Sequence, residues 1–455
     1  MSELDVVILA AGQGTRMRSN RPKVLHELAG RPLLGWVVGA AKSLKPRSIS
    51  IVYGHGGDQV RETFQAEELQ WVHQAEQLGT GHAVQQAAPG LANDGTVLVL
   101  YGDVPLVRPS TLQSMVDGCT ESNLALLTAF VDDPTGYGRI VRESGSVRGI
   151  VEHKDATSAQ LEINEINTGI MALPAGPMRR WLAGLRQDNA QGELYLTDVI
   201  EMAATEGCEV IAAHPECVEE VMGINDRVQL NQLERFWQRQ TANRLMLQGA
   251  TIADPDRVDV RGSVRVGQDV TIDVNVVFEG DVEIADGVHI GPNNVIRNAS
   301  IGAGTQVFAN CVIEDATVGA SSRIGPFARL RPQAELADEV HIGNFVEVKK
   351  SQIGERSKVN HLTYVGDSEI GCDVNVGAGT ITCNYDGANK HKTVIGDNAF
   401  IGSGVELVAP VRIGAGATIG AGSTIGKDAP AEQLTVERAR QSTIQGWKRP
   451  EKKKA

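Results

Sequence analysis

The stretch IADGVHIGPNNVIRNASI, residues 284–301, carries an aliphatic side chain at every sixth position, with one hexad a residue short. The same spacing extends in both directions, from Val260 to Ile425. A period of six fits neither an α-helix nor an alternating β-strand and is instead a signature of a parallel β-helix. Chance spacing in a chain rich in Val and Ile would not keep so many positions in register. The sequence therefore predicts a prism of stacked coils over this span.

Each hexad is expected to supply one short strand and one turn, so that three hexads make a triangular coil. The 166 residues of the span then form roughly nine coils of about 18 residues. A small residue usually follows the aliphatic one, as Gly291 follows Ile290. We expect this small residue to occupy a corner with positive φ, where glycine is unstrained. The aromatic content of 4% suits a core that is too narrow for rings.

The bulk composition describes an ordinary globular chain. Its 455 residues are enough for two or three domains, and 22% of them are charged. The formal charge of −13 argues against general nucleic-acid binding, and the basic tail from Lys448 to Lys454 is best interpreted as a disordered, solvated end. We find no signal sequence and no apolar run of membrane-spanning length, so we expect no membrane association. Six scattered cysteines without a CxxC pair favour reduced thiols in the cytoplasm over disulfides or zinc.

The first motif of the chain is a glycine loop after a strand. Residues 4–10, LDVVILA, predict a buried parallel strand, and AGQGTRM follows at residues 11–17. We interpret this as a strand–glycine loop–helix unit, which is a natural cradle for an anion. The third glycine of a dinucleotide fingerprint is missing, and the loop is not a Walker motif. Arg16 and Lys23 add two cations, so the loop is suited to a triphosphate.

A second motif ends in an aspartate. Strand and helix patterns alternate after the loop, and the strand over residues 97–100 leads into Asp103. Ligands bind at the carboxyl ends of central strands in open α/β sheets, and a carboxylate there is a good Mg²⁺ ligand. On this position alone, a helix cap or turn explains the aspartate equally well. Loops with pocket character follow at residues 136–140, 151–154 and 166–169.

A long polar helix is predicted between the two halves of the chain. It covers about residues 227–248 and carries Leu230, Leu233, Trp237 and Leu245 on its apolar side. We therefore expect an α/β domain with a Rossmann-like, mostly parallel mixed sheet, and then a β-helix of hexapeptide repeats. The predicted boundaries are 1–227 for the α/β domain, 228–248 for the linker helix and 249–455 for the prism with its tail.

These motifs resemble a known family. LAAGxGTRM over residues 9–17, with Pro22-Lys23, is similar to the signature of sugar-1-phosphate nucleotidyltransferases. With the prism behind it, essentially the whole chain resembles the bacterial bifunctional UDP-N-acetylglucosamine pyrophosphorylases and glucosamine-1-phosphate N-acetyltransferases. The resemblance implies a left-handed β-helix, a homotrimer, and a product that feeds peptidoglycan and lipopolysaccharide synthesis.

The resemblance implies uridylyl transfer in the first domain. N-acetylglucosamine 1-phosphate would attack the α-phosphorus of UTP; this nucleophile is already an anion, so the protein has to position and neutralise charge rather than supply a base. Lys23 and Arg16 are the expected catalytic cations, and Asp103 and Asn225 the expected Mg²⁺ ligands. The residues expected to bind UTP or UDP-N-acetylglucosamine are Leu9, Ala10, Ala11, Gly12, Lys23, Gln74, Gly79, Thr80, Tyr101, Gly102, Asp103, Gly138, Glu152, Asn167 and Asn225. Among these, Gln74, Gly79 and Thr80 would read uracil, whereas Gly138, Glu152 and Asn167 would hold the sugar.

Irregularities in the repeat indicate where chemistry occurs on the prism. Residues 383–392, CNYDGANKHK, interrupt the hexads, and an insertion in a solenoid maps to one face, often the binding face. Arg331 and Lys349 stand among apolar and acidic coils and suit a sugar phosphate. Without the resemblance they are as well explained as solvated corner charges.

His361 is the expected general base for acetyl transfer. An amine must lose a proton as it attacks a thioester, histidine titrates in the right range, and His361 lies beside the insertion and matches the family's base. By the resemblance, Arg331, Lys349, Tyr364 and Asn375 would hold glucosamine 1-phosphate. The acetyl-CoA positions would be Ala378, Asn384, Tyr385, Ser403, Ala421 and Arg438.

Two other classes of protein compete with a bifunctional enzyme. The first is a single-activity sugar-1-phosphate nucleotidyltransferase whose β-helix is regulatory or only oligomerises. The intact stretch from His361 to Lys392 argues against it. The second is a non-catalytic scaffold, for which a cationic phosphate loop with a metal site at Lys23, Asp103 and Asn225 would have no use.

Overall fold

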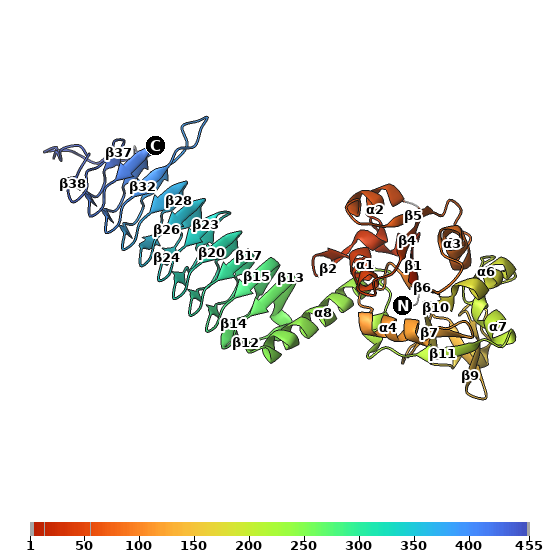
Figure 1. The fold of residues 1–455 in the computed structure, drawn as a ribbon. Helices are drawn as coiled ribbons and strands as arrows, with labels where there is room; N and C mark the ends of the chain where they lie inside the picture. The colour runs from red at the N-terminus through yellow and green to blue at the C-terminus, as the bar shows by residue number, and fades with distance from the viewer. Residues whose placement is uncertain (1–3, 13, 55, 453–455) are drawn as a thin grey trace. The chain divides into compact units, whose positions relative to one another are not determined.

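The computed structural model describes residues 4–12, 14–54 and 56–452, and the chain separates into two compact units between Trp237 and Gln238. Each unit has its own hydrophobic core, and Figure 1 labels helices and strands of both units. Among the described residues, we find no helix of sufficient length and apolar character to cross a bilayer. The last two lysines of the predicted basic tail lie outside the described residues.

The first unit is built on a mixed sheet with the strand order β11-β7-β10-β6-β1-β4-β5. Strand β1 pairs in parallel with β4 and β6, and β4 pairs in parallel with β5, whereas β10 runs antiparallel to β6 and β7. The predicted mostly parallel mixed sheet is therefore confirmed. The strands are β1 Leu4–Ala10, β4 Ser48–Tyr53, β5 Gln70–His73, β6 Thr96–Tyr101, β7 Asn123–Phe130, β10 Glu165–Pro174 and β11 Glu209–Ala213. A hairpin of β8 (Arg139–Glu143) and β9 (Ser146–Val151) joins at β10.

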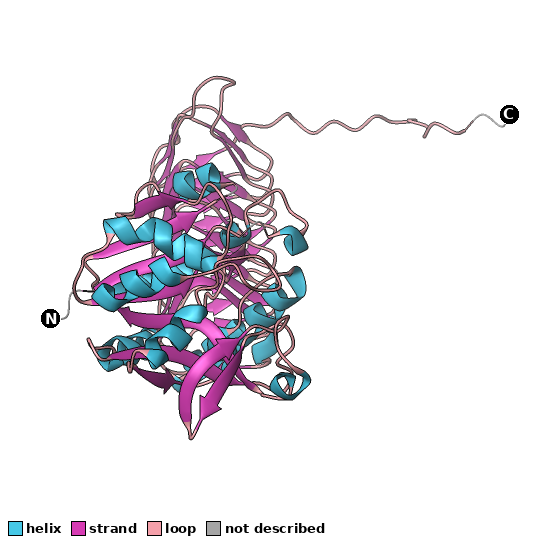
Figure 2. Ribbon diagram, turned by 90° about the vertical axis from the view of Figure 1, so that its right-hand side faces the viewer, coloured by secondary structure: helices cyan, strands magenta, loops and turns pink. Residues whose placement is uncertain are grey.

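Alternate residues of β1 enter different cores on the two faces of this sheet. Val6 and Ile8 pack with helices α1 (Leu33–Ser43) and α4 (Pro109–Gly118). Val7 and Leu9 pack with α3 (Thr80–Ala87), α6 (Ala175–Gly184) and α7 (Asp198–Thr205). The period of two along a strand produces this division, and both faces are buried because helices cover each of them (Figure 2, cyan).

The chain after β1 differs from the expected strand–loop–helix unit. Two short 3₁₀ turns follow, at Thr15–Met17 and Lys23–Leu25, and the first α-helix begins only at Leu33. The expectation of a helix here was wrong, because Arg18 takes a left-handed conformation with φ of 48° and ends the first turn. An anion at this loop would therefore meet loop amides and cations rather than the dipole of a helix.

Helix α8 (Arg227–Leu247) contributes buried side chains to the cores of both units. In its first half Leu233 is buried with Leu28, and the Trp237 ring meets Trp36 with 4.5 Å between centroids. In its second half Ala242 and Leu245 belong to the core of the prism. The Gln238 side-chain amide is hydrogen-bonded to the first coil, since it donates to Val260 O at 2.9 Å and accepts from Val260 N at 2.7 Å.

The second unit is a left-handed parallel β-helix. One face is an eleven-stranded sheet from β12 (Ala250–Ile252) to β38 (Leu434–Thr435), and the other two faces are joined in a sixteen-stranded sheet through β13 (Val258–Val266), β15 (Val276–Ile284) and β17 (Val295–Ile301). Each strand pairs in parallel with the strand one coil later, as Ile272 pairs with Ile290 and Ile290 with Val307. The aliphatic residues of the hexads are stacked in the core, which confirms the predicted prism. The coils also extend beyond the predicted span at both ends.

A second inward position in each hexad was missed in the sequence. Two residues before the aliphatic one, another side chain is fully buried, as Val288 is before Ile290 and Ser322 before Ile324. The alternation of a strand places both on the same side. This position accepts small or polar residues because the backbone satisfies them; Ser322 Oγ accepts a hydrogen bond from Val340 N at 3.1 Å.

The corners of the prism differ from expectation in one respect. The positive φ angles occur at the third residue after the aliphatic one, as at Asn293 (60°) and Asn310 (61°), and not at the glycine directly after it. That glycine is required for a different reason, since a Cβ at Gly343 would overlap Asn360 O of the next coil. Close stacking of the coils, rather than a left-handed backbone, therefore explains the repeated glycines.

Candidate active sites

A cavity of about 360 Å³ lies at the carboxyl ends of β1 and β6, in the middle of the first sheet. Ten of the residues predicted to bind nucleotide line it: Leu9, Ala10, Ala11, Gly12, Lys23, Gln74, Gly79, Thr80, Tyr101 and Asp103. Val24, Gln77, Ala83 and Glu193 complete the lining. Arg16 is exposed and is not among these lining residues. The strand-end position predicted for Asp103 is thus observed.

The two described glycines of the loop have different roles. A Cβ added to Gly12 would meet nothing within 4 Å, so the space beside it is open to a ligand. Gly14 has φ of 63°, and a Cβ there would lie 2.7 Å from Lys23 Cβ. The loop therefore needs glycine at position 14 to let Lys23 approach the cavity. Gln13, between the two glycines, lies outside the described residues.

Lys23 connects the two predicted metal ligands. Its ammonium donates hydrogen bonds to Asp103 Oδ2 and, at 3.2 Å, to Asn225 Oδ1. The backbone holds these residues together as well, since Ile224 N donates to Asp103 O at 2.9 Å. Two oxygens converge on one cation here. That donor set fits Mg²⁺, which usually takes one or two protein oxygens together with substrate phosphates and water.

The side of the cavity predicted to read the base is held by Gln74. The buried Gln74 side chain donates from Nε2 to Gly79 O at 3.1 Å and lies 3.2 Å from His82 Nδ1. Gly79 has φ of 108°, and a Cβ on it would lie 2.6 Å from Leu194 O. The turn before α3 therefore requires glycine at this position, and it fixes the Gln74 amide at the cavity wall.

The predicted sugar-binding residues form a second group that does not line this cavity. Asn167 N donates to Gly138 O at 2.9 Å, and Asn167 Oδ1 accepts from Gly169 N at 2.9 Å. Glu152 accepts a hydrogen bond from Thr197 Oγ1 at 3.1 Å, and burial raises the pKa of its carboxyl group. The carboxylate and amide are acceptors and donors of the kind that bind sugar hydroxyls.

Tyr101 joins the two groups. Its ring lines the cavity and packs against Gly169, where a Cβ would lie 2.5 Å from the ring. Burial raises the pKa of its phenol, so the hydroxyl stays protonated and is a hydrogen-bond donor. The base side and the sugar side of the predicted site are therefore adjacent, as one nucleotide sugar requires.

The sequence reasoning missed the segment from Glu193 to Thr197. Glu193 lines the cavity, Leu196 N donates to Thr80 Oγ1 at 3.2 Å, and Thr197 holds Glu152. The segment connects the base side to the sugar side. Its only sequence signal is Thr197-Asp198, which is typical of a helix start and says nothing of a ligand.

On the prism, four of the six predicted acetyl-CoA residues, Ala378, Ser403, Ala421 and Arg438, lie along one corner, whereas Asn384 and Tyr385 lie in the insertion at residues 383–392. Gly379 N donates to His361 O, Gly404 N to Ala378 O and Gly422 N to Ser403 O, so these coils are stacked directly. His361, Ala378, Ser403 and Ala421 therefore form one row, each a coil from the last. Arg438 Nη1 donates to Ala421 O at 2.9 Å at the end of this row. Such a row suits a long, extended ligand.

His361 is exposed and is oriented by a residue that the sequence did not single out. Its Nδ1 lies 2.7 Å from Asn344 Oδ1, and Asn344 is its register partner in the preceding coil. An amide oxygen only accepts hydrogen bonds, so Nδ1 carries the proton and Nε2 has a free lone pair. That tautomer is the one a general base needs. The register of the hexads, 17 residues back from His361, could have identified Asn344.

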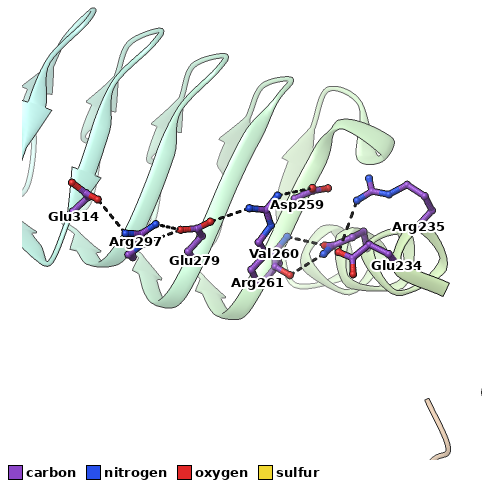
Figure 3. Close-up of polar contacts among 9 residues, drawn as sticks. Glu234, Arg235, Asp259, Val260, Arg261, Glu279, Arg297 and Glu314 are labelled. Atoms are coloured by element: carbon purple, nitrogen blue, oxygen red, sulfur yellow. Dashed lines mark hydrogen bonds and ion pairs between the residues drawn. The ribbon is translucent and has the colours of Figure 1, made fainter. Parts of the chain in front are cut away.

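A column of charges of alternating sign runs along the next face of the prism. Arg261 pairs with Glu279 at 3.0 Å, Glu279 with Arg297, and Arg297 with Glu314 at 3.2 Å (Figure 3). The register continues this column to Arg331 and Lys349. An acid is expected after Arg331, and a lysine stands there instead.

The column therefore ends in excess positive charge. Arg331 is compensated by Glu347 at 2.8 Å, but none of the ion pairs among the described residues includes Lys349. The pKa of Lys349 is lowered by the contact with Lys390 and by the charge of that ammonium. Two neighbouring ammonium groups create a site for an anion such as a phosphate. Lys390 was within the predicted insertion but was not among the predicted ligands.

The insertion folds into a short hairpin that projects from the prism (Figure 1). Asn384 anchors it by donating to Asp367 Oδ2 at 2.6 Å, and Asp386 accepts hydrogen bonds from Asn389 N at 2.7 Å and His391 Nε2 at 2.6 Å. The hairpin and the neighbouring face enclose a cavity of about 540 Å³, lined by residues such as Lys350 and Lys390. None of the predicted acetyl-transfer residues lines that cavity.

One chain does not bring all of the predicted acetyl-transfer residues to one face. Lys349 and Tyr364 lie in β25 (Glu347–Lys349) and β28 (Tyr364–Gly366), and Arg331 directly follows β22 (Arg329–Leu330) on the same face. Asn375 lies in β30 (Asn375–Val376) of the eleven-stranded sheet. His361 stands at the corner between these two faces. The residues are therefore distributed around an edge of the prism rather than gathered in a pocket.

The two units define a class of protein: a nucleotidyltransferase domain joined to a hexapeptide-repeat transferase. Residues 6–250 match a MobA-like NTP transferase domain. Residues 260–353 match a GMPPB C-terminal domain, and residues 392–427 match six repeats of the bacterial transferase hexapeptide.

Relatives over the full length identify the family. The chain is 58% identical over 449 residues to the bifunctional protein GlmU of Acinetobacter baumannii, with 99% of each chain covered. It is 57% identical over 452 residues to that of Ralstonia nicotianae, with 99% of each covered, and 57% identical over 453 residues to that of Marinobacter nauticus, with 99% and 100% covered. The chain belongs to the bifunctional GlmU family. It is a bifunctional enzyme, with uridylyltransferase and N-acetyltransferase activities.

Proposed function

We propose that the two sites act in sequence on one sugar. The prism transfers the acetyl group of acetyl-CoA to glucosamine 1-phosphate, and the first unit joins the resulting N-acetylglucosamine 1-phosphate to UMP from UTP. The observation that carries this proposal is the row at the prism corner, where Asn344 gives His361 the tautomer of a base beside Ala378. A β-helix that only regulated or oligomerised would have no use for an exposed, oriented imidazole.

For uridylyl transfer, the residues of the chain position and neutralise the reactants. Lys23 and the open space beside Gly12 suit the phosphates of UTP, and Arg16 stands exposed beside the loop as a further cation. Gln74 and the Gly79-Thr80 turn face the base, whereas Glu152, Asn167 and Gly138 face the sugar. Because the attacking phosphate oxygen is already negative, charge neutralisation lowers the barrier without a general base.

Asp103 and Asn225 would hold Mg²⁺ in this site. The ion supplies positive charge to the phosphates when it is bound. The Lys23 ammonium now donates to both of these side-chain oxygens. If the oxygens bound the ion instead, the ammonium would be available to the substrate phosphates. The carboxylate of Asp103 and the amide oxygen of Asn225 are ligands of the kind that a hard cation prefers.

For acetyl transfer, His361 would accept a proton at Nε2 from the amine of glucosamine 1-phosphate as that amine attacks the thioester carbonyl. The C–S bond then breaks, and CoA would leave as the thiol after taking this proton from the imidazolium. Asn344 would stabilise the resulting imidazolium, because its amide oxygen already accepts from Nδ1. Acetyl-CoA would lie along the row from Ala378 to Ala421 and reach Arg438. The phosphate of the sugar would bind at Lys349 and Arg331, where the charge column loses its alternation.

Lys349→Ala tests the phosphate assignment. We expect the KM for glucosamine 1-phosphate to rise about 30-fold, because a hydrogen bond to a charged group contributes about 2 kcal/mol. The KM for acetyl-CoA should stay within about twofold, because Lys349 is assigned to the phosphate of the sugar and not to acetyl-CoA. Initial rates at varied concentrations of each substrate measure both constants.

Arg297→Ala is the matched control for this variant. Arg297 stands in the same column but is neutralised by Glu279 and Glu314. Its removal should leave both KM values unchanged. An equal rise in the KM for glucosamine 1-phosphate in both variants would contradict a phosphate site at Lys349.

We propose that the protein forms a homotrimer through its β-helix. Phe327, Phe345 and Leu362 follow one another in the corner turns and are 49%, 56% and 63% exposed. They have φ angles of 56°, 56° and 48°, where a large side chain is strained. The preceding coils carry asparagine at this position. A partner chain packed on these side chains would explain why the strain is tolerated, and it would bring a second face to the acetyl-transfer residues.

Phe345→Asn together with Leu362→Asn tests the trimer. Asparagine tolerates positive φ, so each coil should fold at least as well, while apolar contact with a partner is lost. We expect sedimentation equilibrium to give about one chain mass instead of three, and acetyl transfer to fall with uridylyl transfer unchanged. A trimer of undiminished stability would refute this interface.

We further propose a cytoplasmic location, where UTP and acetyl-CoA are made.

A further inference from the structure

Close to the predicted sugar-binding residues, the buried carboxylate of Glu165 pairs with the solvent-accessible Arg142, and none of the assigned roles uses this ion pair. Glu165, 4% exposed at the start of β10, accepts from Arg142 Nε at 2.7 Å and from Arg142 Nη2 at 2.6 Å. Thr128 Oγ1 of the adjacent strand β7 donates to the same carboxylate at 2.9 Å. Burial would raise the pKa of Glu165, but the hydrogen bonds from Arg142 and Thr128 outweigh burial and hold the pKa below its usual value.

This pair joins two elements that carry the predicted sugar ligands. Asn167 follows Glu165 by two residues on β10. Arg142 lies on the β8–β9 hairpin, whose two ends lead directly to Gly138 and Glu152. The ion pair therefore helps to hold the strand of Asn167 and the hairpin that leads to Glu152 in one relative position.

One backbone hydrogen bond shares this task with the ion pair, because Asn167 N donates to Gly138 O at 2.9 Å. Strand β8 pairs with β10 at a single position, Ile166 with Arg139. On the side toward β11, a cavity of about 490 Å³ lies beside the hairpin and is lined by Arg142 and Val147, while β9 packs on α7 and also contacts β11. Ile140 and Val147 do bury the hairpin's inner face in the core. Apolar packing of that kind sets depth but not lateral position, whereas a two-pronged arginine–carboxylate pair is directional.

We propose that Glu165, held by Arg142, is a positioning residue for the sugar phosphate in uridylyl transfer. The proposal rests on the function assigned to this site above. Without the pair, the hairpin would be held beside Asn167 less firmly, by the hydrogen bond from Asn167 N to Gly138 O and by that from Thr197 to Glu152, and the sugar would lose its fixed contact with both sides. The nucleotide side, which is held by the loop after β1 and by Gln74, would keep its geometry.

The test is the steady-state kinetics of uridylyl transfer by Glu165→Gln in the full-length protein. We expect the KM for N-acetylglucosamine 1-phosphate to rise about tenfold, as for the loss of one subsite hydrogen bond, with the KM for UTP and the rate of acetyl transfer within about twofold of wild type. Arg142→Gln should act in the same way, and Arg142→Lys should recover part of the effect because it keeps the charge without the fork.

Asp5→Asn provides the matched control. Asp5 lies in β1 of the same sheet, away from the sugar side. It is 1% exposed and forms an ion pair with Arg47. Its loss should lower the denaturation midpoint and leave both KM values unchanged. If Glu165→Gln behaved like Asp5→Asn, the pair would be merely structural and the proposal would be overturned.

Thr128→Val keeps the test decisive if Glu165→Gln does not fold. This change removes one hydrogen bond to Glu165 at a fully buried site and preserves shape. A selective rise in the KM for the sugar phosphate supports the proposal, and unchanged constants overturn it. If the wild-type protein itself formed no nucleotide sugar, the assigned function rather than the ion pair would be wrong.

Discussion

His361→Ala is expected to lower the rate of acetyl transfer about 10³-fold and to leave uridylyl transfer unchanged. A positioned general base contributes about 10² to 10⁴-fold to such a reaction, and His361 is the residue whose Nε2 is free beside the acetyl-CoA row. Asn344→Ala should cost less, about tenfold, because the imidazole remains but its tautomer and orientation are no longer fixed. Release of free CoA thiol measures acetyl transfer, and pyrophosphate release measures uridylyl transfer on the same samples.

His289→Ala is the control for this loss. His289 lies exposed on β16 (His289–Ile290) of the same eleven-stranded face, with no assigned part in either reaction. Its removal should leave acetyl transfer at the wild-type rate. Near-normal acetyl transfer by His361→Ala would mean that another group takes the proton, and the base assignment would have to be abandoned.

Asp103→Ala is expected to have the converse effect, with uridylyl transfer reduced by on the order of 10³-fold or more and acetyl transfer retained. The change removes the carboxylate that binds Lys23 and is the proposed charged ligand of Mg²⁺. Preorganised charge at a phosphoryl site typically contributes this much. Chelation of divalent ions with EDTA should abolish uridylyl transfer in the wild type and spare acetyl transfer, because no metal takes part in the proposed chemistry of the prism.

Asp94→Ala controls for the loss of an aspartate next to the same strand. Asp94 precedes β6 at its other end and has an 80% exposed side chain. It should keep both activities. Uridylyl transfer that persisted in Asp103→Ala, or that was insensitive to EDTA, would contradict the metal assignment at Asp103 and Asn225.

The prism was predictable from the sequence because one rule determines it. A side chain such as Ile290 must stack on Val307, and that requirement leaves a period of six in the sequence. The second inward position was missed because it accepts polar residues such as Ser322 as well as apolar ones such as Val288, so its hydrophobic period is interrupted. The corner glycines were predicted for the wrong reason, since the contact that excludes a Cβ at Gly343 comes from the next coil.

The candidate sites were predictable only in part. Motifs close in sequence identified Lys23 and Asp103, and the structure brings them together with Asn225. Their supporting residues left no such trace, because the contacts that matter cross between distant elements. Thr197 reaches Glu152 from 45 positions away, and Asn344 reaches His361 only through the register of the coils. The individual binding roles remain predictions.

The central claim, two active sites in one chain, is tested most directly by one reaction followed by mass spectrometry. Purified protein is mixed with glucosamine 1-phosphate, acetyl-CoA, UTP and Mg²⁺, and each component is omitted in turn. We predict UDP-N-acetylglucosamine only in the complete mixture, with N-acetylglucosamine 1-phosphate accumulating when UTP is left out. A nucleotide sugar that formed only from pre-acetylated sugar phosphate would contradict the claim and would leave the prism without catalytic function.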